Sequence, residues 1–118
     1  MDASDKIKVV EAYIEAFDTC DMNIIRNMYA ANARVEDPVG TPVHDGIEAI
    51  CAFYEGALKS GATLALTGTP RCAGNAVAFA FQARMPGMVV DIIDVFEFNE
   101  DGKVVDMKAY WGPENMQS

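Results

Sequence analysis

The sequence has few residues of the kinds that build metal centres or disulfide frameworks. Its single histidine, His44, cannot supply a multi-histidine metal site within one chain. Cys20, Cys51 and Cys72 are odd in number and form no C-x-x-C pair, which argues against both a disulfide framework and a zinc knuckle. The spacing of the carboxylates suggests no metal site either. We therefore expect no metal.

Basic residues are also scarce. Nine Lys and Arg stand against 18 Asp and Glu, which gives a net charge of −9, and the basic residues are scattered. Nucleic acids and anionic membranes both attract basic patches, so we expect neither as a partner. No apolar run approaches the roughly 18 residues that cross a bilayer, and the polar, acidic start is unlike a secretory signal. We expect a cytoplasmic protein with one domain, residues 1–118.

The first half of the sequence has the period of amphipathic helices. A first helix, with Asp2 or Ser4 as its N-cap, carries apolar residues at the spacing i, i+3, i+4, i+7: Val10, Tyr13, Ile14 and Phe17. A short second helix follows Asp21, and its apolar positions are Ile24, Ile25, Met28 and Tyr29. A third helix runs from about Gly46 to Lys59 and stops at Ser60-Gly61, where glycine suits a left-handed cap.

The second half alternates apolar and polar residues with a period of two, typical of strands. The expected strands are Ala33–Glu36, Thr63–Gly68, Ala76–Met85, Met88–Phe98 and Lys103–Trp111. Turn residues separate the later strands at Gly74-Asn75, Pro86-Gly87 and Asn99–Gly102. Helices followed by hairpins predict an α+β fold: a cone-like, curved antiparallel sheet packed against three N-terminal helices, with a pocket between them.

One carboxylate interrupts the apolar pattern of the strand Met88–Phe98. The even-numbered positions form an apolar face in which Asp94 is the one charged residue. A buried, unpaired carboxylate usually takes up a proton, and a protonated Asp94 would donate a hydrogen bond into the pocket. Two alternatives remain open: the even face points outward, or Asp94 pairs with a cation. Asp91, on the odd face, is expected to point outward or toward a dimer partner.

A second carboxylate lies at the end of the expected strand Ala33–Glu36. Alternation places Asp37 on the apolar side with Val35, and Pro38 holds Asp37 extended and ends the strand. A carboxylate in this setting suits a general base. The simpler alternative is an ordinary Asp-Pro turn.

Three tyrosines lie on the apolar stripes of the expected helices: Tyr13, Tyr29 and Tyr54. A buried phenol hydroxyl needs a hydrogen-bond partner. Each could be an ordinary core residue bonded to backbone, but three that face one pocket favour a network of hydroxyl groups.

Taken together, these features resemble the bacterial Δ5-3-ketosteroid isomerases, within the nuclear transport factor 2-like (SnoaL-like) superfamily. The resemblance covers nearly the whole chain. It rests on Tyr13, the block Val35-Glu36-Asp37-Pro38-Val39-Gly40, the run Ile92-Ile93-Asp94-Val95-Phe96 and the ending Ala109-Tyr110-Trp111-Gly112.

The resemblance implies a steroid Delta-isomerase that converts 3-oxo-Δ5-steroids to 3-oxo-Δ4-steroids through a dienolate. Asp37 would be the general base, Tyr13 and Asp94 would donate hydrogen bonds to the substrate oxygen, and Tyr29 and Tyr54 would position Tyr13. The family needs no metal or organic cofactor and works as a homodimer through the outer face of its sheet. The expected pocket residues are Trp111, Phe53, Phe79, Phe81, Val77 and Met107.

Other functions remain open. Polyketide cyclases, epoxide hydrolases and dehydratases are built on the same cone. A hydrolase would need a second carboxylate and an arginine around a water, so pairing of Asp94 with Arg71 or Arg84 would favour that reading. A dehydratase usually needs inward histidines, whereas His44 is expected at the surface. A non-catalytic carrier of hydrophobic ligands is the remaining alternative.

Overall fold

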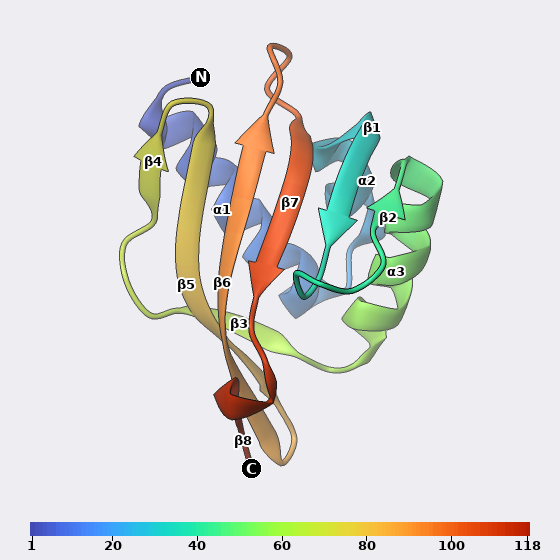
Figure 1. The fold of residues 1–118 in the computed structure, drawn as a ribbon, viewed down its shortest axis with the longest axis vertical. Helices are drawn as coiled ribbons and strands as arrows, with labels where there is room; N and C mark the ends of the chain where they lie inside the picture. The colour runs from blue at the N-terminus through green and yellow to red at the C-terminus, as the bar shows by residue number, and fades with distance from the viewer.

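The computed structural model describes all 118 residues and contains three helices against one curved sheet (Figure 1). The helices are α1 (Ala3–Thr19), α2 (Met22–Met28) and α3 (Ile47–Lys59). The strands are β1 (Tyr29–Glu36), β2 (His44–Asp45), β3 (Thr63–Leu66), β4 (Arg71–Ala73), β5 (Ala76–Met85), β6 (Met88–Phe98), β7 (Val104–Tyr110) and β8 (Met116–Gln117). A short 3₁₀ turn, Pro113–Asn115, precedes β8.

The helices begin where capping residues predict. Asp2 caps α1 in a capping box: its carboxylate accepts from the backbone N–H of Asp5, and the Asp5 carboxylate accepts from the backbone N–H of Asp2. Asp21 caps α2 by accepting from the backbone N–H of Asn23 at 2.9 Å. After α3 the chain reverses at Gly61, whose positive φ of 80° suits glycine.

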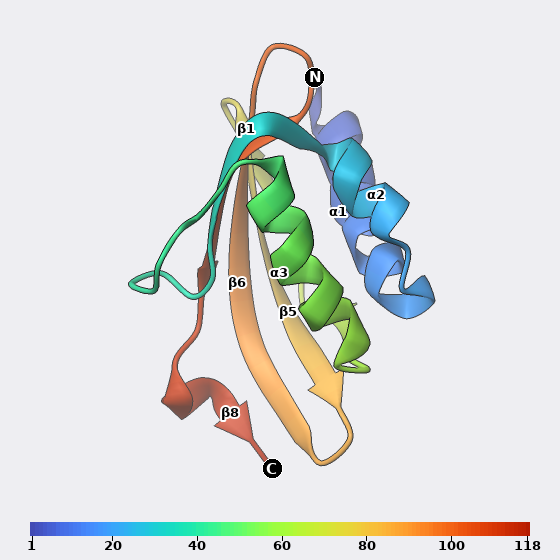
Figure 2. The ribbon, with the colours of Figure 1, turned by 90° about the vertical axis from the view of Figure 1, so that its right-hand side faces the viewer.

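The sheet has the order β2-β1-β7-β6-β5-β3, with β4 added to β5 and β8 added to β6. All three helices cover one face of the sheet (Figure 2). The α+β prediction and the curved sheet are confirmed, but the pairing is not wholly antiparallel. Strand β1 joins β7 in parallel, although β7 comes much later in the chain.

Some boundaries differ from the sequence prediction. Tyr29 was expected on the second helix, but it is the first residue of β1, which therefore starts four residues before the expected Ala33. Strands β2, β4 and β8 were not predicted. They have two or three residues each, too short for alternation to be visible. None of the helices combines the length and apolar character needed to cross a bilayer.

The sheet alternates between a core face and an outer face. On β6 the core face includes Val90, Asp94, Phe96 and Phe98, all buried, whereas Ile93 on the outer face is 48% exposed. The outward alternative for Asp94 is therefore wrong. The buried residues of helices and strands form one continuous hydrophobic cluster.

Met107, on the core face of β7, provides a test of this packing. Because its side chain is fully buried, Met107→Ala should lower the free energy of unfolding by about 2–5 kcal/mol. Met116, 41% exposed, offers the same truncation at the surface, and Met116→Ala should cost less than about 0.5 kcal/mol. Equilibrium unfolding in urea measures both changes. Equal losses would contradict the assignment of Met107 to the core.

Candidate active site

A cavity of about 260 Å³ lies between the helices and the core face of the sheet. Seventeen residues line it, and fourteen of them are hydrophobic. The other three are Asp37, Ser60 and Asp94. A mostly apolar cavity with a few converging polar groups is typical of a small-molecule site.

Asp94 is the most deeply buried acid of the cavity. Its side chain is 1% exposed, and neither carboxylate oxygen has a hydrogen-bond partner within the protein. Burial raises the pKa of Asp94 well above its usual range, the charge of Asp37 raises it further, and the neighbouring Tyr13 hydroxyl offsets these effects only in part. The surroundings of Asp94 therefore favour its neutral form, in which the carboxyl group has a proton to donate.

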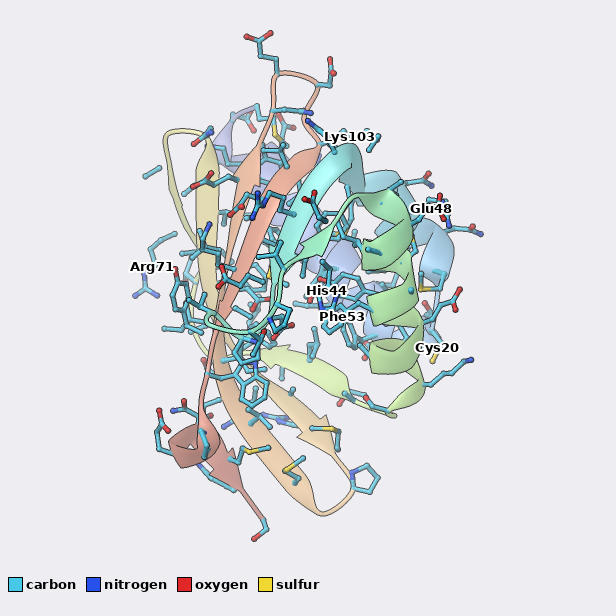
Figure 3. All side chains as sticks on the ribbon, turned by 45° about the vertical axis from the view of Figure 1, so that its right-hand side comes forward. Cys20, His44, Glu48, Phe53, Arg71 and Lys103 are labelled. Atoms are coloured by element: carbon cyan, nitrogen blue, oxygen red, sulfur yellow. The ribbon has the colours of Figure 1, made fainter.

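No cation neutralises Asp94. Arg71 donates to the backbone oxygen of Thr69 and lies on the outer side of the sheet, away from α3 (Figure 3). Arg84 bonds the side chain of Gln82. The cation-paired alternative for Asp94 is therefore wrong, and the arginine pairing that would have favoured a hydrolase is absent.

Asp37 follows the last residue of β1, and its carboxylate enters the same cavity. The indole N–H of Trp111 donates to Asp37 Oδ1 at 2.9 Å. Burial raises the pKa of Asp37, while the Trp111 hydrogen bond and the nearby His44 oppose the rise. Asp37 is less buried than Asp94, and its carboxylate accepts a hydrogen bond from Trp111 that stabilises the ionised form. This is the environment of a base.

Three phenols form a chain beside these acids. The Tyr54 hydroxyl lies 3.2 Å from the Tyr13 hydroxyl and 2.6 Å from the Tyr29 hydroxyl. All three side chains are buried. Of the three, only Tyr13 lines the cavity. The Tyr54 hydroxyl is hydrogen-bonded to that of Tyr13, and the Tyr29 hydroxyl is linked to Tyr13 through Tyr54. The predicted hydroxyl network is present, although Tyr29 reaches it from a strand.

The proton count of this chain fixes one useful direction. Each phenol carries a single proton. If Tyr29 donates to Tyr54, and Tyr54 donates to Tyr13, then the Tyr13 proton remains free for a ligand in the cavity. Burial raises the pKa of all three phenols well above the usual value, so each keeps its proton near pH 7.

The cavity therefore brings together Asp37, whose carboxylate accepts a hydrogen bond from Trp111, and two groups, Tyr13 and Asp94, whose neutral forms are favoured by burial. Asp37 can take a proton from carbon, while Tyr13 and Asp94 can donate to an oxygen that gains negative charge. Such donors act most strongly where water is excluded. This combination suits proton transfer next to a carbonyl group.

The predicted pocket residues divide into two groups. Phe53, Phe81 and Trp111 line the cavity as expected. Val77, Phe79 and Met107 do not, and this is a correction to the sequence prediction. In the strand register Phe79 lies opposite Asp94 and Val77 lies opposite Phe96, so they sit at or beyond the closed end of the cavity. All three are at most 1% exposed and belong to the hydrophobic core.

Several site residues were missed from the sequence. His44 was expected at the surface, but it is half-buried in β2 and stacks on the Phe53 ring, 4.4 Å between centroids (Figure 3). Met85 and Met88 line the cavity and were also missed. The one signal for them in the sequence is that they flank the turn at Pro86-Gly87. Met116 lies in a strand that no pattern revealed, and it lines the cavity too.

Comparisons with known proteins agree with this fold. A family described as the SnoaL-like domain matches residues 10–107. The steroid Delta-isomerase of Nocardioides simplex is 33% identical over 111 residues, which cover 91% of this chain and 89% of that protein. The solved structure of the epoxide hydrolase/cyclase-like enzyme SalBIII, with a role in pyran ring formation in the polyether salinomycin, has a TM-score of 0.90 and 26% identity. The match covers 98% of this chain and 96% of the other.

The fold and the comparisons define the class: a nuclear transport factor 2-like protein with a mostly apolar cavity between sheet and helices. The chain belongs to the SnoaL-like domain family. The relatives named above are an isomerase and an epoxide hydrolase/cyclase-like enzyme, so enzymatic activity is supported.

Asp94→Asn tests the neutral state of Asp94. Because the pKa of Asp94 in the folded chain lies above its ordinary value of 3.8, the contribution of Asp94 to the free energy of unfolding falls as the pH rises above that value. Asparagine cannot ionise, so Asp94→Asn should be more stable than the native chain at pH 7, and the difference should shrink toward pH 4. Urea unfolding at several pH values measures this.

The exposed Asp101, in the turn between β6 and β7, gives the control for that comparison. Asp101→Asn should leave the pH dependence of unfolding unchanged. A native chain and an Asp94→Asn variant with parallel pH profiles would show that Asp94 is ionised in the folded protein.

Proposed function

We propose that the chain is a steroid Delta-isomerase that converts 3-oxo-Δ5-steroids to their 3-oxo-Δ4 isomers. The observation that carries this proposal is the meeting of three groups in one apolar cavity: Asp37 as a base, and Tyr13 with a neutral Asp94 as donors. The identity to the steroid Delta-isomerase of Nocardioides simplex supports the substrate class.

The reaction needs only these side chains. Asp37 takes a proton from C4 of the substrate, and the electrons of the broken C–H bond form a dienolate whose charge rests on the C3 oxygen. Tyr13 and Asp94 donate hydrogen bonds to that oxygen. Asp37 then returns the proton to C6, and the double bond ends in conjugation with the carbonyl. Because the bound intermediate stays beside the same carboxylate, no second acid is required.

Tyr54 and Tyr29 are positioning residues in this scheme. The Tyr54 hydroxyl is hydrogen-bonded to the Tyr13 and Tyr29 hydroxyls, and either member of each pair can donate. The scheme assigns Tyr54 as the donor to Tyr13 and Tyr29 as the donor to Tyr54, which leaves the Tyr13 proton directed at the substrate. A hydrogen bond received by Tyr13 also polarises its own O–H bond, which strengthens the donor.

The absorbance of the conjugated enone product follows the conversion directly. Asp37→Asn should lower kcat on the order of 10³-fold, because the base is lost. Tyr13→Phe and Asp94→Ala should each lower kcat on the order of 10²- to 10³-fold, because each removes one donor to the oxyanion.

Tyr110→Phe serves as the control for these variants. Tyr110 is 47% exposed and does not line the cavity, so loss of its hydroxyl should leave kcat unchanged. A well-folded native chain that converts no 3-oxo-Δ5-steroid would refute the proposed function.

The pH profile tests the contact between Trp111 and Asp37. Activity requires ionised Asp37, so kcat/KM should fall as the pH drops through the pKa of that carboxyl. The indole N–H of Trp111 lowers the pKa of Asp37, and Trp111→Phe removes this donor, so the pKa of Asp37 should rise in the variant. The acid limb should therefore move to higher pH in the variant and stay in place in Tyr110→Phe. An unmoved limb would mean that the indole does not stabilise the carboxylate.

Epoxide opening is the second candidate. A neutral Asp94 could protonate the oxygen of an epoxide in the same cavity. Asp37 could act as the base that activates a hydroxyl group or water to open the ring. The likeness to SalBIII favours this alternative. An epoxide-bearing hydroxy compound tests it: turnover of that compound, with none of a 3-oxo-Δ5-steroid, would assign the chain to epoxide chemistry.

A homodimer through the outer face of the sheet remains part of the proposal. Ile93 on β6 and Tyr110 on β7 are direct neighbours in the strand register, 48% and 47% exposed. Between them they place apolar surface at the centre of that face. Asp91, which accepts hydrogen bonds from Gln82 and Gln117, lies on the same outer side.

A further inference from the structure

The cavity is longer than its catalytic end requires. Four residues of one strand face line it in succession: Asp94, Ile92, Val90 and Met88 of β6. Six residue steps separate Asp94 from Met88, or about 20 Å along a strand. The fused rings of a steroid span roughly half that length. A substrate whose carbonyl oxygen meets Asp94 therefore ends well short of Met88.

The two ends of the cavity differ in exposure. At the catalytic end Asp94 and Tyr13 are buried, and Phe79 packs behind Tyr13 at 6.2 Å between ring centroids. At the other end Met85 and Met88 are half-buried, Ser60 is exposed, and Met116 is 41% exposed. The cavity thus opens at the tip of the β5–β6 hairpin, which extends beyond the end of α3 beside β8 (Figure 2).

Three methionines surround this open end, and each comes from a different strand. Met85 of β5 pairs with Met88 of β6 in the strand register, and Met116 of β8 pairs with Val90. All three line the cavity. Methionine is unbranched and flexible, so such a wall adapts to apolar groups of varied shape.

The charge of the lining restricts what can lie against these methionines. The cavity lining contains no lysine, arginine or histidine, and its two ionisable carboxyl groups, Asp37 and Asp94, lie at the catalytic end. The one polar group near the opening is the Ser60 hydroxyl, which already donates to the Ala57 backbone oxygen. An anionic group held against the lining would therefore find no cationic partner within the cavity.

We propose that the substrate of this enzyme is a 3-oxosteroid with an uncharged, apolar side chain on the ring farthest from the carbonyl, and that Met85, Met88 and Met116 bind that side chain. The inference rests on the proposed function, because the isomerase reaction fixes the carbonyl at the Asp94 end. The side chain lies along Val90 and Met88 toward the opening, where flexible methionine side chains cover it.

Trp111 provides a measurement that does not depend on turnover. It is the only tryptophan of the chain, and it lines the cavity. Its fluorescence therefore reports binding of 3-oxo-Δ4-steroid products in equilibrium titrations. We compare three ligands: one without a side chain at C17, one with an alkyl chain there, and one with a chain of the same length that ends in a carboxylate.

The alkyl-chain ligand should bind at least about tenfold more tightly than the ligand without a chain, since each buried methylene is worth about a fourfold gain. The carboxylate-ended ligand should lose most of that gain. In the double variant Met88→Ala/Met116→Ala, the Kd of the ligand without a chain divided by the Kd of the alkyl-chain ligand should fall at least about threefold. Met22→Ala, in a helix that contributes nothing to the cavity lining, should leave the ratio as in the native chain.

Equal Kd values for ligands with and without the alkyl chain would overturn the inference, as would a gain that survives in Met88→Ala/Met116→Ala. Equal binding of the carboxylate-ended ligand would overturn the requirement for an uncharged chain. A parallel assay with the matching 3-oxo-Δ5-steroids separates the two claims. Isomerisation without a side-chain preference refutes this inference alone, and failure to isomerise either steroid refutes the proposed function.

Discussion

The burial of one carboxyl group on an apolar strand face is the constraint on which the site depends. Asp94 has no cation and no protein hydrogen-bond partner, so its ionised form is far less stable than its neutral form. The fold accepts this cost at a single position of β6, among Ile92, Phe96 and Phe98. Such an unsatisfied group in an otherwise well-packed core is what a ligand oxygen would complete.

The same low dielectric gives the other polar groups their separate roles. Both acids are raised in pKa by burial, but only Asp37 has an indole donor to stabilise its charge. The three phenols keep their protons for the same reason that Asp94 does. In the proposed reaction, differences in burial and in hydrogen bonding would make similar side chains into a base and a set of donors, without any lysine, arginine or histidine in the cavity lining.

Sequence patterns located the buried carboxyl group better than they located the cavity wall. Asp94 was evident because strand alternation is strict, and one charged residue on an apolar face stands out. The pocket wall was not evident, because Val77 and Phe79 alternate on β5 in the same way as Phe81. The position of each residue along β5 decides whether its side chain lies in the core or lines the cavity, and that position is fixed by the pairing with β6. Tyr29 was placed on the wrong element because helix α2 passes directly into β1, with no turn residue between them.

The parallel pairing of β1 with β7 has a consequence for synthesis of the chain. Asp37 and Trp111 are 74 positions apart, so the ribosome completes β1 long before it makes the strand that pairs with it. Until then the hydrogen-bonding edge of β1 that faces β7 has no partner, and open edges of this kind invite association between unfinished chains. The nascent protein can acquire a hydrogen-bonded Asp37 only after Trp111 has been added, 74 positions later. Chains released early therefore lack this contact, however well their helices have formed.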